Sequence, residues 1–275
     1  MTRIDEPELT SGSVFSIGFP SASETLETFG LKFTAGGAHI SRTMMLAELS
    51  AVLAKVPQGS SPADYREAIL QQNVLAKTTD STRQKSLRHL RELYALDEAT
   101  PIFGLLRRLQ EIDGTSLPLL AFQVAWARDP LLRATTPPVM DASDGERIET
   151  SRLAQALEVA FPAQYSEISL STIARNTASS WAQSGHLVGR VQKTRQRINP
   201  SVVAVTMALF FGGIAGYNGP AVFSNPWCRL LDLNADRARA MGIEAHRAGL
   251  LNLRLIGEVI ELTFPLFAKF QEHQP

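Results

Sequence analysis

Residues 166–197 read SEISLSTIARNTASSWAQSGHLVGRVQKTRQR, and this stretch decides the class of fold. Ser169 or Ser171 can cap a helix, because a serine hydroxyl accepts a hydrogen bond from a free N–H of the first turn. The helix is expected to run to Gln183. Gly185 then stands where helices commonly end in the left-handed conformation.

The residues that follow this helix predict a small β-structure. Residues 186–191 (HLVGRV) are typical of a short strand, and residues 193–197 (KTRQR) form a basic tip or return strand. The order helix, glycine, strand and basic loop is the layout of a winged helix-turn-helix. We therefore expect a winged-helix-like unit over 147–200 within a mostly α-helical protein.

The chemistry of this segment suits double-stranded DNA. Small polar side chains with Arg and Asn can reach base edges in the major groove, while Arg and Lys on a wing can neutralise phosphates. No acidic residue lies between Glu167 and Asp232, whereas several basic residues do. The predicted DNA-binding residues are Arg175, Asn176, Ser179, Ser180 and Gln183 on the helix and Arg190, Lys193, Arg195 and Arg197 on the wing. A protein-docking wing and an ordinary solvated surface are the alternatives.

The composition limits what kind of protein this is. The chain has 275 residues with 27 Lys and Arg against 27 Asp and Glu, so its formal net charge is zero. A balanced total excludes a histone-like polycation but not a local basic face. The single cysteine, Cys228, allows no internal disulfide, so we expect a cytoplasmic protein.

Residues 33–135 predict a helical bundle. Apolar residues recur at three- and four-residue spacing throughout, and none of this region from Ser41 to Trp126 alternates with period two. Capping signals mark the expected helix starts at Ser41, Ser61-Pro62, Thr79 or Asp80, Thr100-Pro101 and about Ser116. A secondary DNA-binding surface is expected on the third of these helices, at Arg83, Lys85, Arg88 and Arg91.

The segments outside the bundle have different compositions. Residues 1–32 are acidic and are expected to form a loosely packed arm without a signal peptide, with at most a short edge strand at Phe15, Ile17 and Phe19. The Pro-rich and acidic stretch Thr136 to Glu146 predicts a loop at a domain boundary. A helix from Glu149 to Ala160 follows it.

The C-terminal region, 201–275, predicts helices and a terminal hairpin. Val202 to Ala215 is apolar but too short to span a bilayer, so we expect a buried core helix and no membrane partner. Asn234 to Ala248 predicts a further helix, and residues 250–264 a hairpin turned at Gly257. This hairpin is apolar and carries Glu258 and Glu261, so it is a candidate surface for a homodimer rather than for DNA.

No catalytic or cofactor motif stands out. The five histidines lack metal-ligand spacing, and the glycines at 212–216 follow an apolar helical run rather than a strand, which favours close helix packing over nucleotide binding. We therefore expect a non-enzymatic protein with no cofactor and no metal.

Short motifs in a characteristic order resemble the BrxA family of BREX (bacteriophage exclusion) defence systems. They comprise Phe33-Thr34-Ala35-Gly36-Gly37, Leu46-Ala47-Glu48-Leu49, Asp64-Tyr65-Arg66, Ile69 to Leu75, Thr78 to Thr82, Ser171-Thr172 and Ser184-Gly185-His186-Leu187. The resemblance implies a small, mostly helical, non-enzymatic subunit that binds DNA beside other components of a phage-defence complex. The acidic arm and the residues after about Pro200 depart from this pattern.

These sequence features support three functional hypotheses. The first is a DNA-binding subunit of a BREX-like system, with double-stranded DNA and other defence subunits as partners. The second is a scaffold that assembles such subunits, and the third is a winged-helix transcription regulator that acts as a homodimer on a palindromic site.

Overall fold

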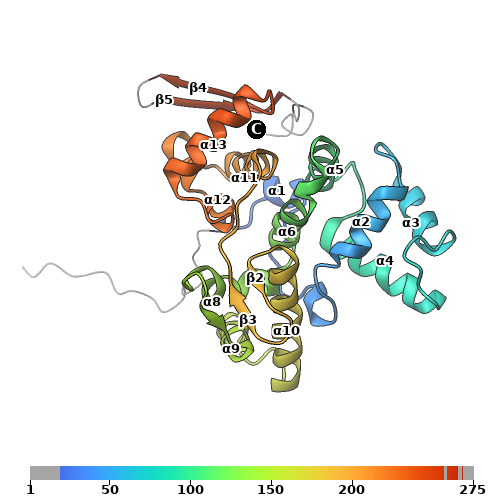
Figure 1. Ribbon diagram of the computed structural model, residues 1–275. Coiled ribbons are helices and arrows are strands. Elements are labelled where there is room, and N and C mark those ends of the chain that lie inside the picture. Colours follow the sequence, from blue (N-terminus) through green and yellow to red (C-terminus); the bar gives the residue numbers. More distant parts are fainter. Residues whose placement is uncertain (1–18, 257–258, 266–267, 269–275) are drawn as a thin grey trace, which may run out of the picture.

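The computed structural model describes residues 19–256, 259–265 and 268, and helices dominate it (Figure 1). This confirms the expected mostly α-helical fold. The first half of the chain contains α1 (Glu24–Phe29), η1 (Ala38–Ile40), α2 (Leu46–Lys55), α3 (Pro62–Leu70), α4 (Asp80–Tyr94), α5 (Pro101–Ile112), η2 (Gly114–Ser116) and α6 (Leu117–Arg128).

Side-chain caps set the starts of several helices. The Ser61 hydroxyl accepts a hydrogen bond from the N–H of Asp64, and Pro62 fills the first helical position of α3. Thr79 caps α4 through the N–H of Thr82. These starts are where the capping residues of the sequence predict them, because a cap depends only on residues three positions apart.

Two of the expected boundaries were wrong. Ser41 does not cap a helix but follows η1, and α2 begins five residues later, after Met45 in the left-handed conformation. Hydrogen bonds to α10, described below, hold residues 39–46 in this non-helical path. The expected loop at Thr136 to Glu146 begins with a short helix, α8 (Thr136–Met140).

The N-terminal segment is also more ordered than expected where the structure describes it. α1 carries buried Leu26 and Phe29, and Leu31 behind it is buried as well. Leu26, Phe29 and Leu31 therefore pack into the core, because moving apolar side chains out of water is favourable. Phe15 and Ile17, the start of the expected edge strand, lie outside the described residues.

The second half of the chain adds two small antiparallel sheets. Their strand orders are β1-β3-β2 and β4-β5. The elements are α7 (Pro130–Ala134), α8, β1 (Arg147–Ile148), α9 (Thr150–Ala160), α10 (Glu167–Gln183), β2 (Leu187–Val188), β3 (Lys193–Arg195), α11 (Val202–Ile214), η3 (Gly219–Ser224), α12 (Pro226–Leu230), α13 (Ala235–Arg247), β4 (Asn252–Ile256) and β5 (Val259–Thr263).

Helix α11 is the centre of the C-terminal region. Every residue from Val203 to Gly212 is buried, which confirms the expected core helix. A Cβ on Gly212 would lie 2.3 Å from the Nδ2 of Asn225, so glycine is required for close packing there. Within the described ranges, no helix has both the length and the apolar character needed to cross a bilayer.

The terminal hairpin forms as the sequence predicts, with Asn252 opposite Thr263 and Ile256 opposite Val259. Its turn, Gly257 and Glu258, lies outside the described residues. The buried apolar side chains form one connected cluster that extends from Leu26 to Phe264. The division of the chain into four units stays a prediction.

Candidate nucleic-acid interface

The segment from β1 to β3 places α10 beside a three-stranded sheet. Thr194 of β3 is paired with Arg147 on one side and Val188 on the other, so β3 is the central strand. The N–H of Arg195 donates to the carbonyl of Glu146 at 2.8 Å, which extends this pairing. β1 thus connects the sequence before α9 to the two strands after α10.

Helix α10 begins slightly earlier than expected and ends where expected. Its cap is Ser166, rather than Ser169 or Ser171, and Glu167 then lies in the first turn, where a negative charge is favourable. Gly185 has a φ of +89° after the last turn. The inward face is the one that the sequence predicts, because Ile173 and Trp181 are fully buried.

Part of the polar face of α10 binds another segment of the same chain. Asn176 donates through Nδ2 to the carbonyl of His39 at 2.9 Å, and Gln183 accepts from the N–H of Leu46 at 3.1 Å. Ser180 is fully buried. These three residues were expected to face DNA, but the segment from η1 to α2 already uses their hydrogen-bonding groups.

Ser180 belongs to a buried cluster with His39 and Asp129. The Nε2 of His39 lies 2.8 Å from the Ser180 hydroxyl, and its Nδ1 lies 2.7 Å from a carboxylate oxygen of Asp129. Burial disfavours the Asp129 carboxylate, but the contacts with His39 outweigh burial and lower the pKa of Asp129. The Ser180 hydroxyl also accepts from the N–H of Met44 at 2.8 Å.

This cluster has the order of groups used in nucleophilic catalysis, a serine beside a histidine beside an aspartate. However, Ser180 and His39 are 0% exposed and Asp129 is 1% exposed, so no substrate can reach the hydroxyl. The cluster therefore connects η1 to α10 and to the start of α7. It was not recognised from the sequence because its members are 51 to 141 positions apart.

A neighbouring face of α10 remains open, since Ser179 lies three positions from Asn176 and four positions from Gln183 on the helix. Arg175 is exposed, and its Nη2 donates to the Thr172 hydroxyl at 3.1 Å. Ser179 is half-buried and donates to the carbonyl of Arg175 at 2.9 Å. Of the five α10 residues expected to contact DNA, Arg175 is exposed, Ser180 is buried, and Asn176, Ser179 and Gln183 are half-buried.

The tip between β2 and β3 carries Arg190 and Lys193, neither of which pairs with a carboxylate in the part of the chain that the structure describes. Gly189 has a φ of +98° and opens the turn. Arg190 is exposed, and Lys193 is half-buried with its Nζ donating to the carbonyl of Gly189 at 3.0 Å. Val191 between them is 90% exposed.

The other two expected wing cations bind Asp232. Arg195 is 1% exposed and donates to the Asp232 carboxylate, so it is part of the core and not of a DNA surface. Arg197 contacts the same carboxylate at 2.7 Å, although about half of its side chain remains exposed. Burial opposes ionisation of Asp232, but the Ile198 N–H and the two arginines outweigh it and lower its pKa.

The expected basic face of α4 is only partly free. Lys85, Arg88 and Arg91 are exposed. Arg83 instead turns back and donates to the carbonyl of Leu70 at 2.7 Å. Three of the four residues expected there therefore reach solvent.

Arg42 is a cation that the sequence analysis did not identify. It follows η1, which lies between α10 and α4: Asn176 holds the carbonyl of His39 on one side, and the Ser41 hydroxyl lies 3.3 Å from the Nε2 of His89 on the other. Burial lowers the pKa of His89, and the positive charges of Arg88 and Arg42 lower it further. The absence of acidic residues between Glu27 and Glu48 was the sequence signal for this residue.

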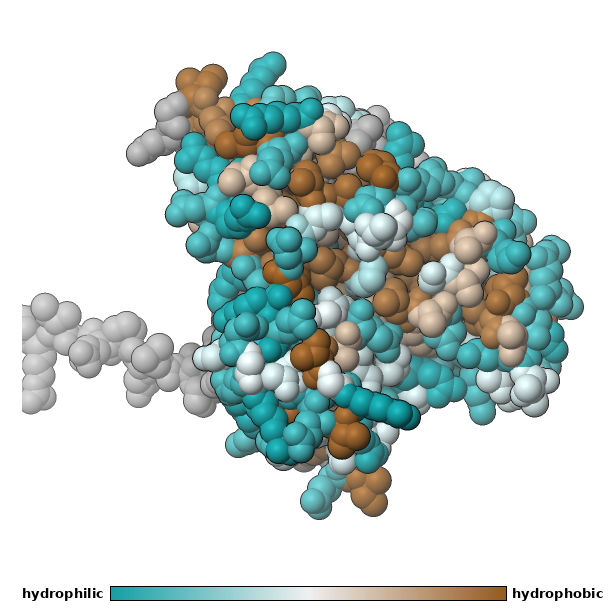
Figure 2. Space-filling model, in the orientation of Figure 1, coloured by the Kyte–Doolittle hydropathy of each residue, from teal (hydrophilic) through white to brown (hydrophobic). Residues whose placement is uncertain are grey.

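The surface over α10 and the wing is mainly hydrophilic, with isolated hydrophobic residues (Figure 2). No protein-family model matches the chain, and no curated protein matches it. The geometry of this surface is therefore the basis for assigning a function.

Proposed function

We propose that β1–α9–α10–β2–β3 is a winged-helix unit that binds double-stranded DNA. The observation that carries this proposal is the exposed face of α10 beside a three-stranded sheet with a basic turn at its tip. Arg175 and Ser179 face the major groove, while Arg190 and Lys193 contact phosphates on either side of it. Asn176, Ser180, Gln183 and Arg195 are structural residues in this proposal.

A second set of phosphate contacts extends from this unit. Arg42 follows η1, which contacts both α10 and α4, and Arg88 with Lys85 and Arg91 continues the positive charge along α4. A duplex that lies on α10 and the wing would meet these side chains with its flanking phosphates. Such contacts increase affinity without reading sequence.

The role that fits this activity is a non-enzymatic subunit of a BREX-like anti-phage defence system. The order of motifs from Phe33 to Gly189 that resembles the BrxA family supports it. In that role the protein would hold DNA beside the other subunits of the complex.

The test compares two arginines that differ only in position. Arg175 lies on the open face of α10, and Arg108 is exposed on α5. Arg175→Ala should weaken duplex binding by about 1–3 kcal/mol, roughly fivefold to 150-fold, and Arg108→Ala should leave it unchanged. Fluorescence anisotropy with a labelled duplex measures both, and equal losses in the two variants would contradict the proposal.

A protein-docking wing is the second candidate, and one observation favours it. Val188 is 43% exposed and Val191 is 90% exposed, so the tip carries apolar as well as basic side chains. Apolar side chains contribute little to phosphate binding but contribute strongly to protein interfaces. Val191→Asp should then abolish the capture of a defence subunit from nuclease-treated cells, whereas a DNA-binding wing would lose only part of its duplex affinity.

A further inference from the structure

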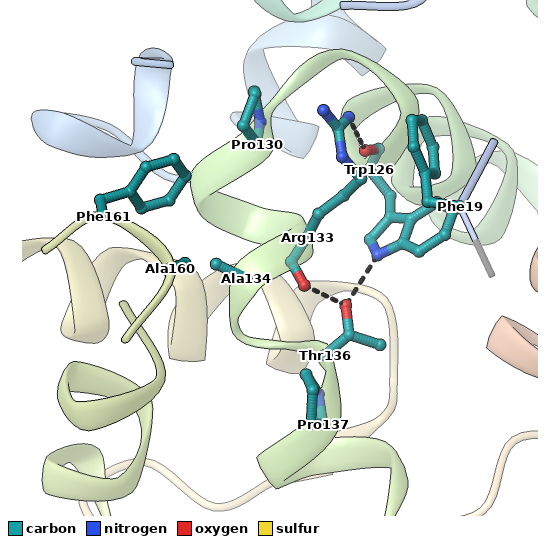
Figure 3. Close-up of a pocket in the computed structure, with 9 residues that line it drawn as sticks. All are labelled: Phe19, Trp126, Pro130, Arg133, Ala134, Thr136, Pro137, Ala160 and Phe161. Carbon is teal, nitrogen blue, oxygen red and sulfur yellow. Dashed lines mark hydrogen bonds between the residues drawn. The ribbon is translucent and has the colours of Figure 1, made fainter. Parts of the chain in front are cut away.

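A pocket of about 250 Å³ opens beside α7, and none of its lining residues is among those assigned to DNA. Its lining residues come from the N-terminal segment, α6, α7, α8 and the end of α9 (Figure 3). They are Phe19, Trp126, Pro130, Arg133, Ala134, Thr136, Pro137, Ala160 and Phe161.

The walls of the pocket are mainly apolar, and three of the nine lining residues are aromatic. Phe161 lies on one side of Arg133 and Phe19 on the other (Figure 3). The rings of Phe19 and Trp126 meet edge to face, with their centroids 5.1 Å apart. These surfaces suit a planar apolar group, because aromatic rings pack favourably in offset or edge-to-face arrangements.

The neutral polar groups of the lining are already satisfied. Trp126 donates through Nε1 to the Thr136 hydroxyl at 2.8 Å. That hydroxyl in turn donates to the carbonyl of Arg133 at 2.6 Å. A ligand therefore gains little from hydrogen bonds to Thr136 or to the indole, and the charged group of the lining is what remains.

Among the described residues that line the pocket, Arg133 alone is charged. Its guanidinium lies over the Phe19 ring, 4.1 Å from the centroid. Nη1 donates to the carbonyls of Trp126 and Ala127, each at 2.9 Å, and Nη2 donates to the carbonyl of Lys32. Burial lowers the pKa of Arg133 to about 10, with the Asp129 charge opposing this shift.

Two donors of Arg133 have no partner among the described residues. A guanidinium has five N–H groups, and three of them bind backbone carbonyls, which leaves Nε–H and one hydrogen of Nη2. These hydrogens are on different nitrogens of one planar group, which is how arginine binds both oxygens of a carboxylate. The charge also has no carboxylate within ion-pair distance in the described part of the chain, so a bound anion would compensate its desolvation.

We propose that this pocket binds a small aromatic carboxylate, with its ring against the aromatic walls and its carboxylate on the free donors of Arg133. The volume is below the roughly 300–1,000 Å³ of drug-sized sites, so the ligand has on the order of ten non-hydrogen atoms. This site is independent of the DNA-binding surface, and neither proposal depends on the other.

The first test uses the wild-type chain and two probes. Isothermal titration calorimetry should detect binding of 3-phenylpropionate, and 3-phenylpropionamide, which has the same shape but no charge, should bind at least about tenfold more weakly. Equal affinities for the two probes, or no heat from the acid up to about 5 mM, would overturn the proposal.

The second test fills the pocket without removing Arg133. Ala160→Phe places a ring in the lining, whereas Val159→Phe adds the same ring to a side chain of α9 that is 52% exposed and outside the lining. Ala160→Phe should lower the affinity for 3-phenylpropionate at least about tenfold, and Val159→Phe should leave it unchanged. Equal affinities in both variants would mean that the probe binds elsewhere and would overturn the assignment. Melting curves for each variant establish that the fold is intact.

Discussion

Two parts of the molecule have the same local order, a helix, a glycine and a β-hairpin, but their hairpins differ. After α10 and Gly185, the β2–β3 tip carries Arg190 and Lys193, and β1 adds a third strand to its sheet. After α13 and Gly249, the β4–β5 hairpin has two strands and is visibly hydrophobic in part (Figure 2). Its charges Arg254 and Glu261 lie opposite each other and pair at 3.5 Å.

This difference shows that the order of secondary-structure elements does not by itself determine which partner a hairpin can bind. In the first hairpin, the tip cations Arg190 and Lys193 have no carboxylate partner in the described part of the chain. Arg195 and Arg197 at its base pair with Asp232. Charge on the second is balanced by cross-strand pairing, and exposed Ile256 and Val259 remain at its end. The first hairpin suits an anionic surface, and the second suits an apolar one.

The largest expected effect separates the ion pairs of the two hairpins. Asp232→Ala leaves Arg195 buried without its carboxylate and should lower the free energy of unfolding by about 3–5 kcal/mol. Glu261→Ala removes an exposed pair and should cost less than about 1 kcal/mol. Urea unfolding measures both, and similar losses would show that Asp232 does not hold the first hairpin in place.

The two histidines next to the hairpins should differ in their effect on stability against pH. His186 is fully buried, and burial lowers its pKa to about 4, while the Nε2 contact with the carbonyl of Leu230 at 2.7 Å opposes this shift. The unfolded chain binds a proton near pH 6.5 and the folded chain does not, so stability is present above that pH. It falls as the pH drops toward about 4, by about 3 kcal/mol in total.

His246 in the second region supplies the control for this pH dependence. It is exposed, so the same substitution there removes a histidine that is not buried. His186→Asn should flatten the loss of stability between about pH 6.5 and 4, and His246→Asn should not. Urea unfolding across this pH range is the measurement, and an unchanged slope in His186→Asn would exclude His186 as the group responsible.

The glycines of the two regions should also differ in tolerance. A Cβ on Gly189 would lie 2.0 Å from the carbonyl oxygen of Gln192, whereas Gly249 has open space around its Cα. Gly189→Ala should therefore lower stability by about 2–3 kcal/mol or distort the tip, and Gly249→Ala by only about 1 kcal/mol for its left-handed conformation. Thermal unfolding measures the Tm of both variants. Equal decreases in Tm would contradict the close contact between Gly189 and Gln192.

The smallest expected effect is on DNA affinity and its dependence on salt. The double variant Arg190→Ala/Lys193→Ala should reduce the log–log salt slope by about 1.8, because two phosphate contacts are lost. The matched variant Arg247→Ala/Arg254→Ala removes the same charge from the second region and should leave the slope unchanged. Anisotropy titrations over a salt series provide the slopes, and parallel changes would mean that only the net charge matters.

Much of the architecture was predictable because it depends on short-range signals. The helices α3, α4, α9 and α10, the buried α11 and the terminal hairpin follow from apolar periodicity and caps over a few residues. The sequence-based predictions were wrong where hydrogen bonds to residues far along the chain determine the local conformation. The segment at Ser41 is not helical because Ser180, more than 130 positions later, binds the N–H of Met44.

The candidate site was predictable only in outline. The basic character of residues 190–197 is visible in the sequence, but the pairing of Arg195 and Arg197 with Asp232 is not, because that aspartate lies 35 to 37 positions away. Arg42 was missed because His89, whose pKa its charge lowers, lies on α4, 47 positions later in the chain.

The amino-acid order by itself determined where helices and hairpins form, since hydrogen bonds and apolar spacing within a few residues decide those. Only the tertiary structure decided which polar groups are free. Burial and pairing depend on residues brought together from distant parts of the chain. Here they bury Ser180 and Arg195 and bind the Asn176 amide to His39, while Arg175 and Arg190 stay exposed and Lys193 stays half-exposed.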